Sequence, residues 1–139
     1  MKKAKLFYGI GSGLMILMGI GHFYGQFGTK GMDIHRSLIE EAMRGYTIKG
    51  FGFEYSMMDV MQCWGIFFGL LMMFVGVQNM LILRESSSGL SIKKFALFNV
   101  LIVAVLMAIG SIYVPFTAVG FGVILLFFLV SAVLFRKVN

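Results

Sequence analysis

The sequence is poor in charged residues. Only 13% of its 139 residues are Asp, Glu, Lys or Arg, which is about half the share in an ordinary soluble domain. Residues 95–135 hold no charged side chain. A helix of that length would reach roughly 60 Å, about twice the hydrocarbon thickness of a bilayer. The only proline, Pro115, lies near the middle of the run, so the run predicts two membrane crossings joined by a tight turn.

Cysteine and the common catalytic motifs are also scarce. The single cysteine, Cys63, excludes an intramolecular disulfide and leaves the redox compartment unspecified. The sequence has no G-x-x-x-x-G-K-[ST] loop, no H-E-x-x-H and no C-x-x-C, so it assigns no cofactor and no catalytic residue. The net charge of +6 is not gathered on a foldable soluble surface. It therefore indicates lipid headgroups as the partner and argues against nucleic acid.

Long apolar segments are what the sequence does have. Two of them precede the uncharged run, and each suits one crossing of about 20 residues. Inside a bilayer only helices satisfy every backbone group within one segment. The sequence therefore predicts an all-α integral membrane four-helix bundle. We expect residues 1–139 to form one domain, with an outer loop at 29–57 and spans at about 6–28, 58–83, 94–113 and 116–135.

The basic residues predict the orientation of the spans. Eight of the twelve flank the same side, where Glu85 is the only acidic residue. By the positive-inside bias, both termini are expected in the cytoplasm, in a multi-pass protein of the inner (cytoplasmic) membrane. The N-terminus is basic and then apolar like a signal peptide, but it lacks a cleavage site and is expected to remain as an anchor. The eight residues are Lys2, Lys3, Lys5, Arg84, Lys93, Lys94, Arg136 and Lys137.

The outer loop contains a segment with helical periodicity at residues 32–46. Leu38, Ile39 and Met43 fall on one face, and charged residues fall on the other. This pattern predicts a short amphipathic helix that lies on the outer membrane surface or caps the bundle. We expect residues 50–53 to end it. Tyr55 and Trp64 are expected in the aromatic belt at the outer interface.

Glycines spaced four apart predict close contacts between the first two spans, because small residues let helix backbones approach in lipid. Near the cytoplasmic ends of the second and third spans, Gln78, Asn79 and Asn99 lie at one level, and a structural amide hydrogen bond is expected there. Contacts within the chain are favoured over homodimerisation. The helix-packing residues are Gly9, Gly13, Gly21, Gly25, Gly65, Gly69 and Gly76.

Four residues are candidates for a ligand or proton-linked role: His22, Asp59, Cys63 and His35. An ionisable side chain within a span is a functional hypothesis that requires a partner. His22 and Asp59 are expected at similar depth and could form a hydrogen bond. A structural clasp is favoured, with a proton-coupled or ligand-binding role as the alternative. A metal enclosed by all four is the weakest alternative, because no two have a recognised metal-site spacing, so no metal ligand is assigned.

Short motifs carry a family resemblance. Gly21-His22 with Gly25 and Phe27, and Tyr55-Ser56 with Asp59, Gly65 and Phe67, resemble a group of small, largely uncharacterised bacterial four-span membrane proteins. This chain departs from the family pattern at Met58, where tryptophan is expected. The resemblance covers roughly the first 80 residues. It implies a four-helix bundle with His22 and Asp59 as family positions, and it brings no established reaction. A looser similarity to DoxX-type bundles concerns the fold alone.

The sequence supports three functional hypotheses. The first is an accessory or structural subunit, without catalytic activity of its own, of a larger membrane complex. The second is a small transporter or ligand-binding bundle that uses His22 and Asp59 near the outer face. The third is a membrane oxidoreductase, which the sequence supports only through Cys63 and the many aromatic residues. The expected partners are the lipid bilayer and either a larger complex or further copies of the chain.

Overall fold

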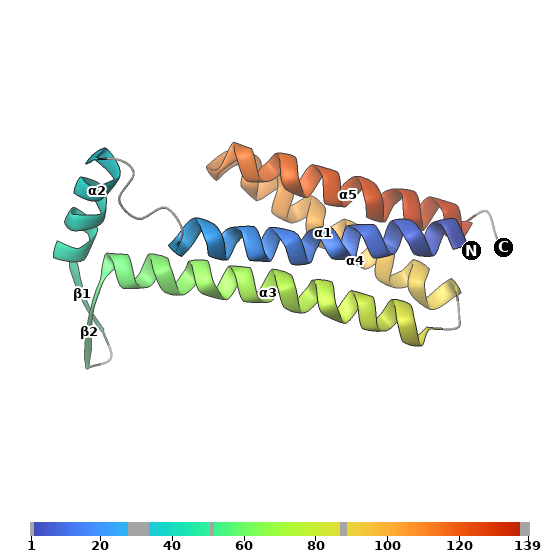
Figure 1. Ribbon diagram of the computed structural model, residues 1–139, viewed down its shortest axis with the longest axis horizontal. Coiled ribbons are helices and arrows are strands. Elements are labelled where there is room, and N and C mark those ends of the chain that lie inside the picture. Colours follow the sequence, from blue (N-terminus) through green and yellow to red (C-terminus); the bar gives the residue numbers. More distant parts are fainter. Residues whose placement is uncertain (1, 28–33, 51, 87–88, 137–139) are drawn as a thin grey trace. The chain divides into compact units, whose positions relative to one another are not determined.

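A computed structural model describes residues 2–27, 34–50, 52–86 and 89–136. Its long apolar helices form an all-α four-helix bundle, as predicted from the sequence. The predicted end of the first span at residue 28 and the first part of the outer loop, residues 29–33, lie outside the described residues. The elements in Figure 1 are α1 (Lys2–Phe27), α2 (Ile34–Gly45), β1 (Thr47–Gly50), β2 (Phe53–Ser56), α3 (Met57–Glu85), α4 (Gly89–Tyr113) and α5 (Pro115–Arg136).

The chain divides into two compact units. The first, called the helix unit, consists of Met1–Met18 and Met73–Asn139 and contains parts of all four long helices. The second, called the loop unit, is Gly19–Met72, which holds the end of α1, the short elements and the first half of α3.

Glycine brings α1 and α3 together in the helix unit. A Cβ atom added to Gly76 would lie 2.6 Å from Ile16 Cγ1 and 2.8 Å from the Ser12 carbonyl oxygen. Because a backbone atom blocks that space, only glycine fits without moving a helix. Gly9 and Gly13 approach Leu83 and Met80 less closely, at 3.2 and 3.6 Å from their added Cβ atoms. Gly9, Gly13 and Gly76 thus lie where α1 and α3 face each other in this unit.

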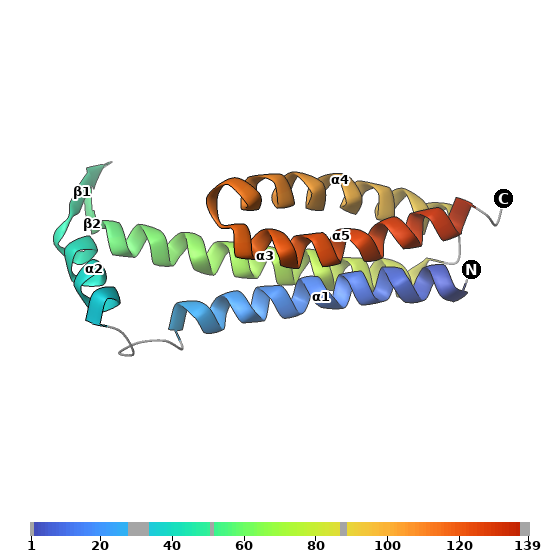
Figure 2. The same ribbon diagram turned by 90° about the horizontal axis from the view of Figure 1, so that it is seen from above.

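Helices α4 and α5 are antiparallel neighbours joined by Val114 alone (Figure 2). Pro115 is the first residue of α5, a position that suits proline because the first helical N–H has no partner within the helix. The backbone N–H of Thr117 and its hydroxyl both donate to the Val114 carbonyl, at 2.9 and 2.8 Å. The predicted tight turn is therefore confirmed.

The loop unit contains the predicted amphipathic helix, α2, and a β-hairpin that was not predicted. Strands β1 and β2 are antiparallel, with Lys49 opposite Glu54. The Lys49 ammonium lies 3.4 Å from the Glu54 carboxylate, and Gly52 adopts the positive φ of 80° that the turn requires. Strands of four residues give too short an alternating pattern to be recognised, and the glycines indicated only the end of a helix.

The outside of the four long helices is apolar. Large hydrophobic side chains on every one of them are exposed, including Leu17, Phe67, Phe98 and Leu126, each at about 60% or more. No more than a third of the most apolar window of any of these four described helices is buried inside the protein. Such a surface requires a lipid environment.

Candidate functional site

A cluster of three buried polar side chains lies inside the helix unit. Tyr8 of α1 donates from its hydroxyl to Asn79 Oδ1 of α3 at 2.7 Å. Asn99 of α4 donates from Nδ2 to the same oxygen at 3.0 Å, and Asn79 Nδ2 donates to Asn99 Oδ1 at 3.3 Å. The exposed fraction is zero for Tyr8 and 4% for each asparagine. The cluster therefore joins three helices through polar groups that water does not reach.

The expected amide hydrogen bond between Asn99 and the end of the second span is thus confirmed for Asn79, whereas Gln78 is exposed. Tyr8 was missed by the sequence reasoning. Its position three residues after Lys5, at the basic end of α1, matches that of Asn79 five residues before Arg84. Counting residues inward from the basic residues at these two helix ends would have predicted that Tyr8 and Asn79 lie at a similar depth.

Two serines in the same unit bond to backbone carbonyls. Ser12 Oγ donates to the carbonyl of Tyr8 at 2.8 Å, within α1. Ser131 Oγ of α5 donates to the carbonyl of Ala4 at 2.9 Å. Both serine side chains are completely buried. The second bond ties α5 to α1, so hydrogen bonds connect all four helices of this unit.

Asp59 lies at the start of α3 and closes a capping box with Ser56. Asp59 Oδ2 accepts from the backbone N–H of Ser56 at 2.9 Å and from its hydroxyl at 2.7 Å. The Asp59 backbone N–H donates back to Ser56 Oγ at 3.2 Å. This reciprocal arrangement satisfies N–H groups that a helix start leaves without partners. The motif Ser-x-x-Asp was visible in the sequence and would have indicated this structural role.

His22 and Asp59 are not brought together among the described residues. The His22 ring packs edge-on against Phe68, with ring centroids 5.1 Å apart, while Asp59 bonds to Ser56. Phe68 lies nine positions along α3 from Asp59, about 14 Å along the axis. The expected hydrogen bond assumed that α1 and α3 reach their outer ends at the same level, whereas α3 begins well beyond the depth of His22.

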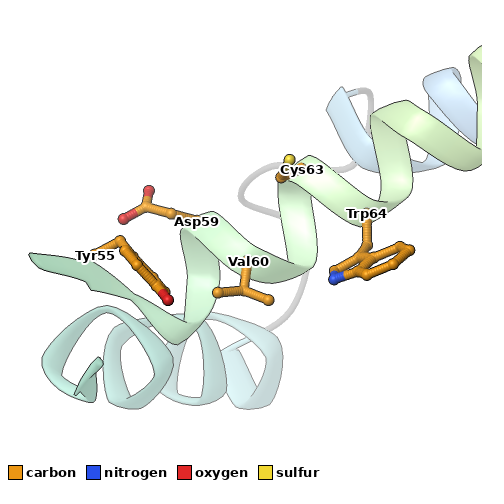
Figure 3. A pocket seen from close by; sticks show the side chains of 5 residues that line it. All are labelled: Tyr55, Asp59, Val60, Cys63 and Trp64. Carbon is orange, nitrogen blue, oxygen red and sulfur yellow. The ribbon is translucent and has the colours of Figure 1, made fainter. Parts of the chain in front are cut away.

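Asp59 and Cys63, one helical turn apart, line the same open hollow of about 370 Å³ together with Tyr55, Val60 and Trp64. In Figure 3, Asp59 and Cys63 project from one side of α3, whereas Val60 and Trp64 project from the other. His22 and His35 are not among the lining residues. Within the part of the chain that the structure describes, no three His, Cys, Asp or Glu side chains are grouped to hold a metal.

The helix-packing glycines of the loop unit divide into two groups. A Cβ on Gly69 would lie 2.7 Å from the Phe23 ring and 3.2 Å from the Gly19 carbonyl, and Gly65 is buried. Gly21 and Gly25 are instead exposed, and an added Cβ on either would meet no atom of the described residues within 4 Å. Their expected packing against the second span is not seen among the described residues, where His22 and Phe23 occupy the face of α1 that meets α3.

The four apolar helices, with their exposed hydrophobic side chains, make this chain a multi-pass membrane protein. Comparisons of the chain with known protein families, with curated proteins and with solved structures find no match. The resemblance to small bacterial four-span proteins and to DoxX-type bundles therefore stays a prediction.

Proposed function

We propose that this protein is an accessory or structural subunit of a larger membrane complex and has no catalytic activity of its own. The observation that carries the proposal is the Tyr8–Asn79–Asn99 cluster, in which buried polar groups bond to one another. Polar side chains that hold helices together stabilise a bundle in lipid, where apolar contacts alone give little preference for protein over lipid.

A transporter requires polar groups that a substrate can reach. In the helix unit the most buried polar side chains, Ser12, Ser131 and the three cluster residues, all have partners inside the protein. No buried side-chain nitrogen or oxygen among the described residues lacks one. These bonds support a rigid scaffold, since opening the cluster to a substrate would leave amides without partners in an apolar surrounding.

The docking surface that we assign is the part of α1 around Gly21. Gly21 is exposed, and its large neighbours Ile20 and Tyr24 are exposed by 50% and 71%. A small residue among large ones forms a notch into which a partner helix can fit closely. A transmembrane helix of a larger subunit is therefore the partner that suits this surface.

We also propose that the protein resides in the cytoplasmic membrane of a bacterium, with both termini in the cytoplasm. The charge asymmetry supports this orientation. Lys5 Nζ donates to the carbonyl of Ser86 at 3.2 Å, so the basic start of α1 and the basic α3–α4 connection share one end of the helix unit. Labelling of Cys63 by a membrane-impermeant maleimide from the outer side is expected, and labelling only from the cytoplasm would reverse the orientation.

Native mass spectrometry of the tagged protein, extracted from its own membrane in mild detergent, tests the proposed role. We expect larger polypeptides at fixed stoichiometry. Gly21→Ile should reduce their recovery at least severalfold, because the new side chain fills the notch, and its Cβ would meet no atom of the described residues within 4 Å. Ala108→Ile, at an exposed position of α4, is the matched control and should keep them. Recovery of the wild-type chain without other polypeptides would refute the accessory role.

A second candidate is a ligand-binding or small transport bundle, favoured by the hollow that Asp59 and Cys63 line. Such a protein would carry a small-molecule mass on a lone chain or homo-oligomer in the same native spectrum. His22→Ala separates the two roles. An accessory subunit should keep its partners after this change, whereas a transporter that uses His22 should lose pH-dependent activity.

A further inference from the structure

The apolar face of α2 is exposed. Leu38 and Ile39 are exposed by 57% and 60%, although the sequence pattern places them on one side of the helix. Ser37 and Arg44 occupy the opposite side, and they are exposed as well. Large apolar side chains gathered on one exposed face mark an interaction surface.

The start of α3 gives the depth of α2. Trp64 is exposed on the first half of α3, and tryptophan is enriched at the membrane–water interface. Met57 lies about 10 Å farther along the axis than Trp64. The Met57 backbone N–H donates to the carbonyl of Tyr46 at 2.9 Å, directly after α2. The C-terminal end of α2 is therefore held at the outer part of the headgroup layer.

The direction of α2 suits the same location. Within the loop unit, α2 runs across the line of α3 in both views (Figures 1 and 2). Because α3 is apolar enough to cross the bilayer, a helix that runs across it follows the membrane plane.

Aromatic residues of the loop unit are also exposed. Tyr46, Phe53 and Trp64 are exposed by 65%, 73% and 71%. Aromatic side chains are enriched at membrane interfaces, where an apolar ring and a polar tip are both accommodated. Strand β2 passes into α3 with no residue between them. Phe53 therefore lies only four positions before the start of α3.

We propose that the apolar face of α2 is inserted among the phospholipid headgroups, so that α2 is an in-plane membrane anchor between two transmembrane helices. A lipid surface suits this face better than a protein partner, because the covalent and hydrogen-bonded link to α3 holds α2 at headgroup depth. The two basic and two acidic residues of α2 cancel. Insertion therefore depends on apolar burial and occurs in zwitterionic lipid without anionic lipid.

The test uses the full-length chain in nanodiscs of phosphatidylcholine. Cys63→Ser removes the only cysteine, and Leu38→Cys or Arg44→Cys then introduces one label site on each face of α2. An environment-sensitive fluorophore at position 38 should emit at shorter wavelength and be quenched by lipids that carry a shallow nitroxide. The same fluorophore at position 44, the matched control, should be quenched by aqueous iodide. Emission of Trp64, the only tryptophan, checks that each variant is folded.

Two results would overturn the inference. Equal quenching of positions 38 and 44 by iodide would show that α2 lies in water. Protection of position 38 from both iodide and the lipid-borne nitroxide would show that a protein surface, from a second copy or another chain, covers the face. Replacement of phosphatidylcholine by a mixture with anionic lipid should leave the quenching ratio of the two positions unchanged.

Discussion

The two units of this chain place polar and apolar side chains in opposite ways. In the helix unit, the polar groups of Tyr8, Asn79 and Asn99 are inside and bonded to one another, while large apolar side chains are outside. In the loop unit, charged and apolar side chains are both exposed, on opposite faces of α2. The first arrangement suits a hydrocarbon solvent, and the second suits a boundary between lipid and water. The two units thus differ in where their polar and apolar side chains lie because the surroundings that suit them differ.

The largest effect on this comparison is expected from Gly76→Leu in the helix unit. The new side chain would collide with Ile16 and with the Ser12 carbonyl, a backbone atom that cannot move alone. We expect a loss of about 3 kcal/mol or more in the free energy of unfolding. Gly69→Leu in the loop unit should cost less, because its closest neighbour is the movable Phe23 ring. Thermal unfolding in detergent measures both, with Gly21→Leu as the control that should change little.

Removal of one amide tests whether the helix unit depends on its polar interior. Asn99→Leu takes away both hydrogen bonds to Asn79 and should lower the free energy of unfolding by about 1 to 3 kcal/mol. In the double variant with Asn79→Leu the losses should not add, because no buried amide remains without a partner. A double-mutant cycle measures this coupling. Strict additivity of the two losses would mean that the amides stabilise the bundle independently.

A smaller effect is expected at the capping box of the loop unit. Ser56→Ala removes the hydroxyl that accepts from the backbone N–H of Asp59 and should cost about 1 kcal/mol. Asp59→Asn keeps an acceptor for the Ser56 N–H and should cost less. Hydrogen exchange of the first turn of α3 is the appropriate measurement, since a capping effect is local. If Asp59→Asn abolished an activity but left exchange unchanged, the hollow would be a functional site.

The smallest effect is expected at the hairpin ion pair. The side chains of Lys49 and Glu54 are exposed by 77% and 59%, so water screens their attraction. Lys49→Gln should change the free energy of unfolding by less than about 1 kcal/mol, and less still at high salt. Chemical denaturation at low and high salt measures the change. A large loss would show that the exposed loop unit depends on specific polar contacts as the helix unit does.

Residues with a regular pattern were predicted well. The uncharged run around Pro115 predicted the α4–α5 turn, and the period of Leu38, Ile39 and Met43 predicted α2. The Asn79–Asn99 bond was predicted because both residues lie near charged helix ends, which mark depth. The prediction of a His22–Asp59 bond was wrong, because no charged residue marks where α1 ends relative to the start of α3. A shift of two helical turns between the helices is enough to separate two such residues.

The sequence by itself determined the solvent of each segment. Lengths of uncharged chain predict membrane spans because a bilayer has one hydrocarbon thickness and a helix has one rise per residue. Only the tertiary structure decided which side chains meet. Small rotations and shifts of neighbouring helices placed Gly76 against Ser12, left Gly21 exposed and kept His22 away from Asp59. Gly76 and Gly21 were both expected to pack between helices, but contact between helices depends on their register, which sequence spacing alone does not determine.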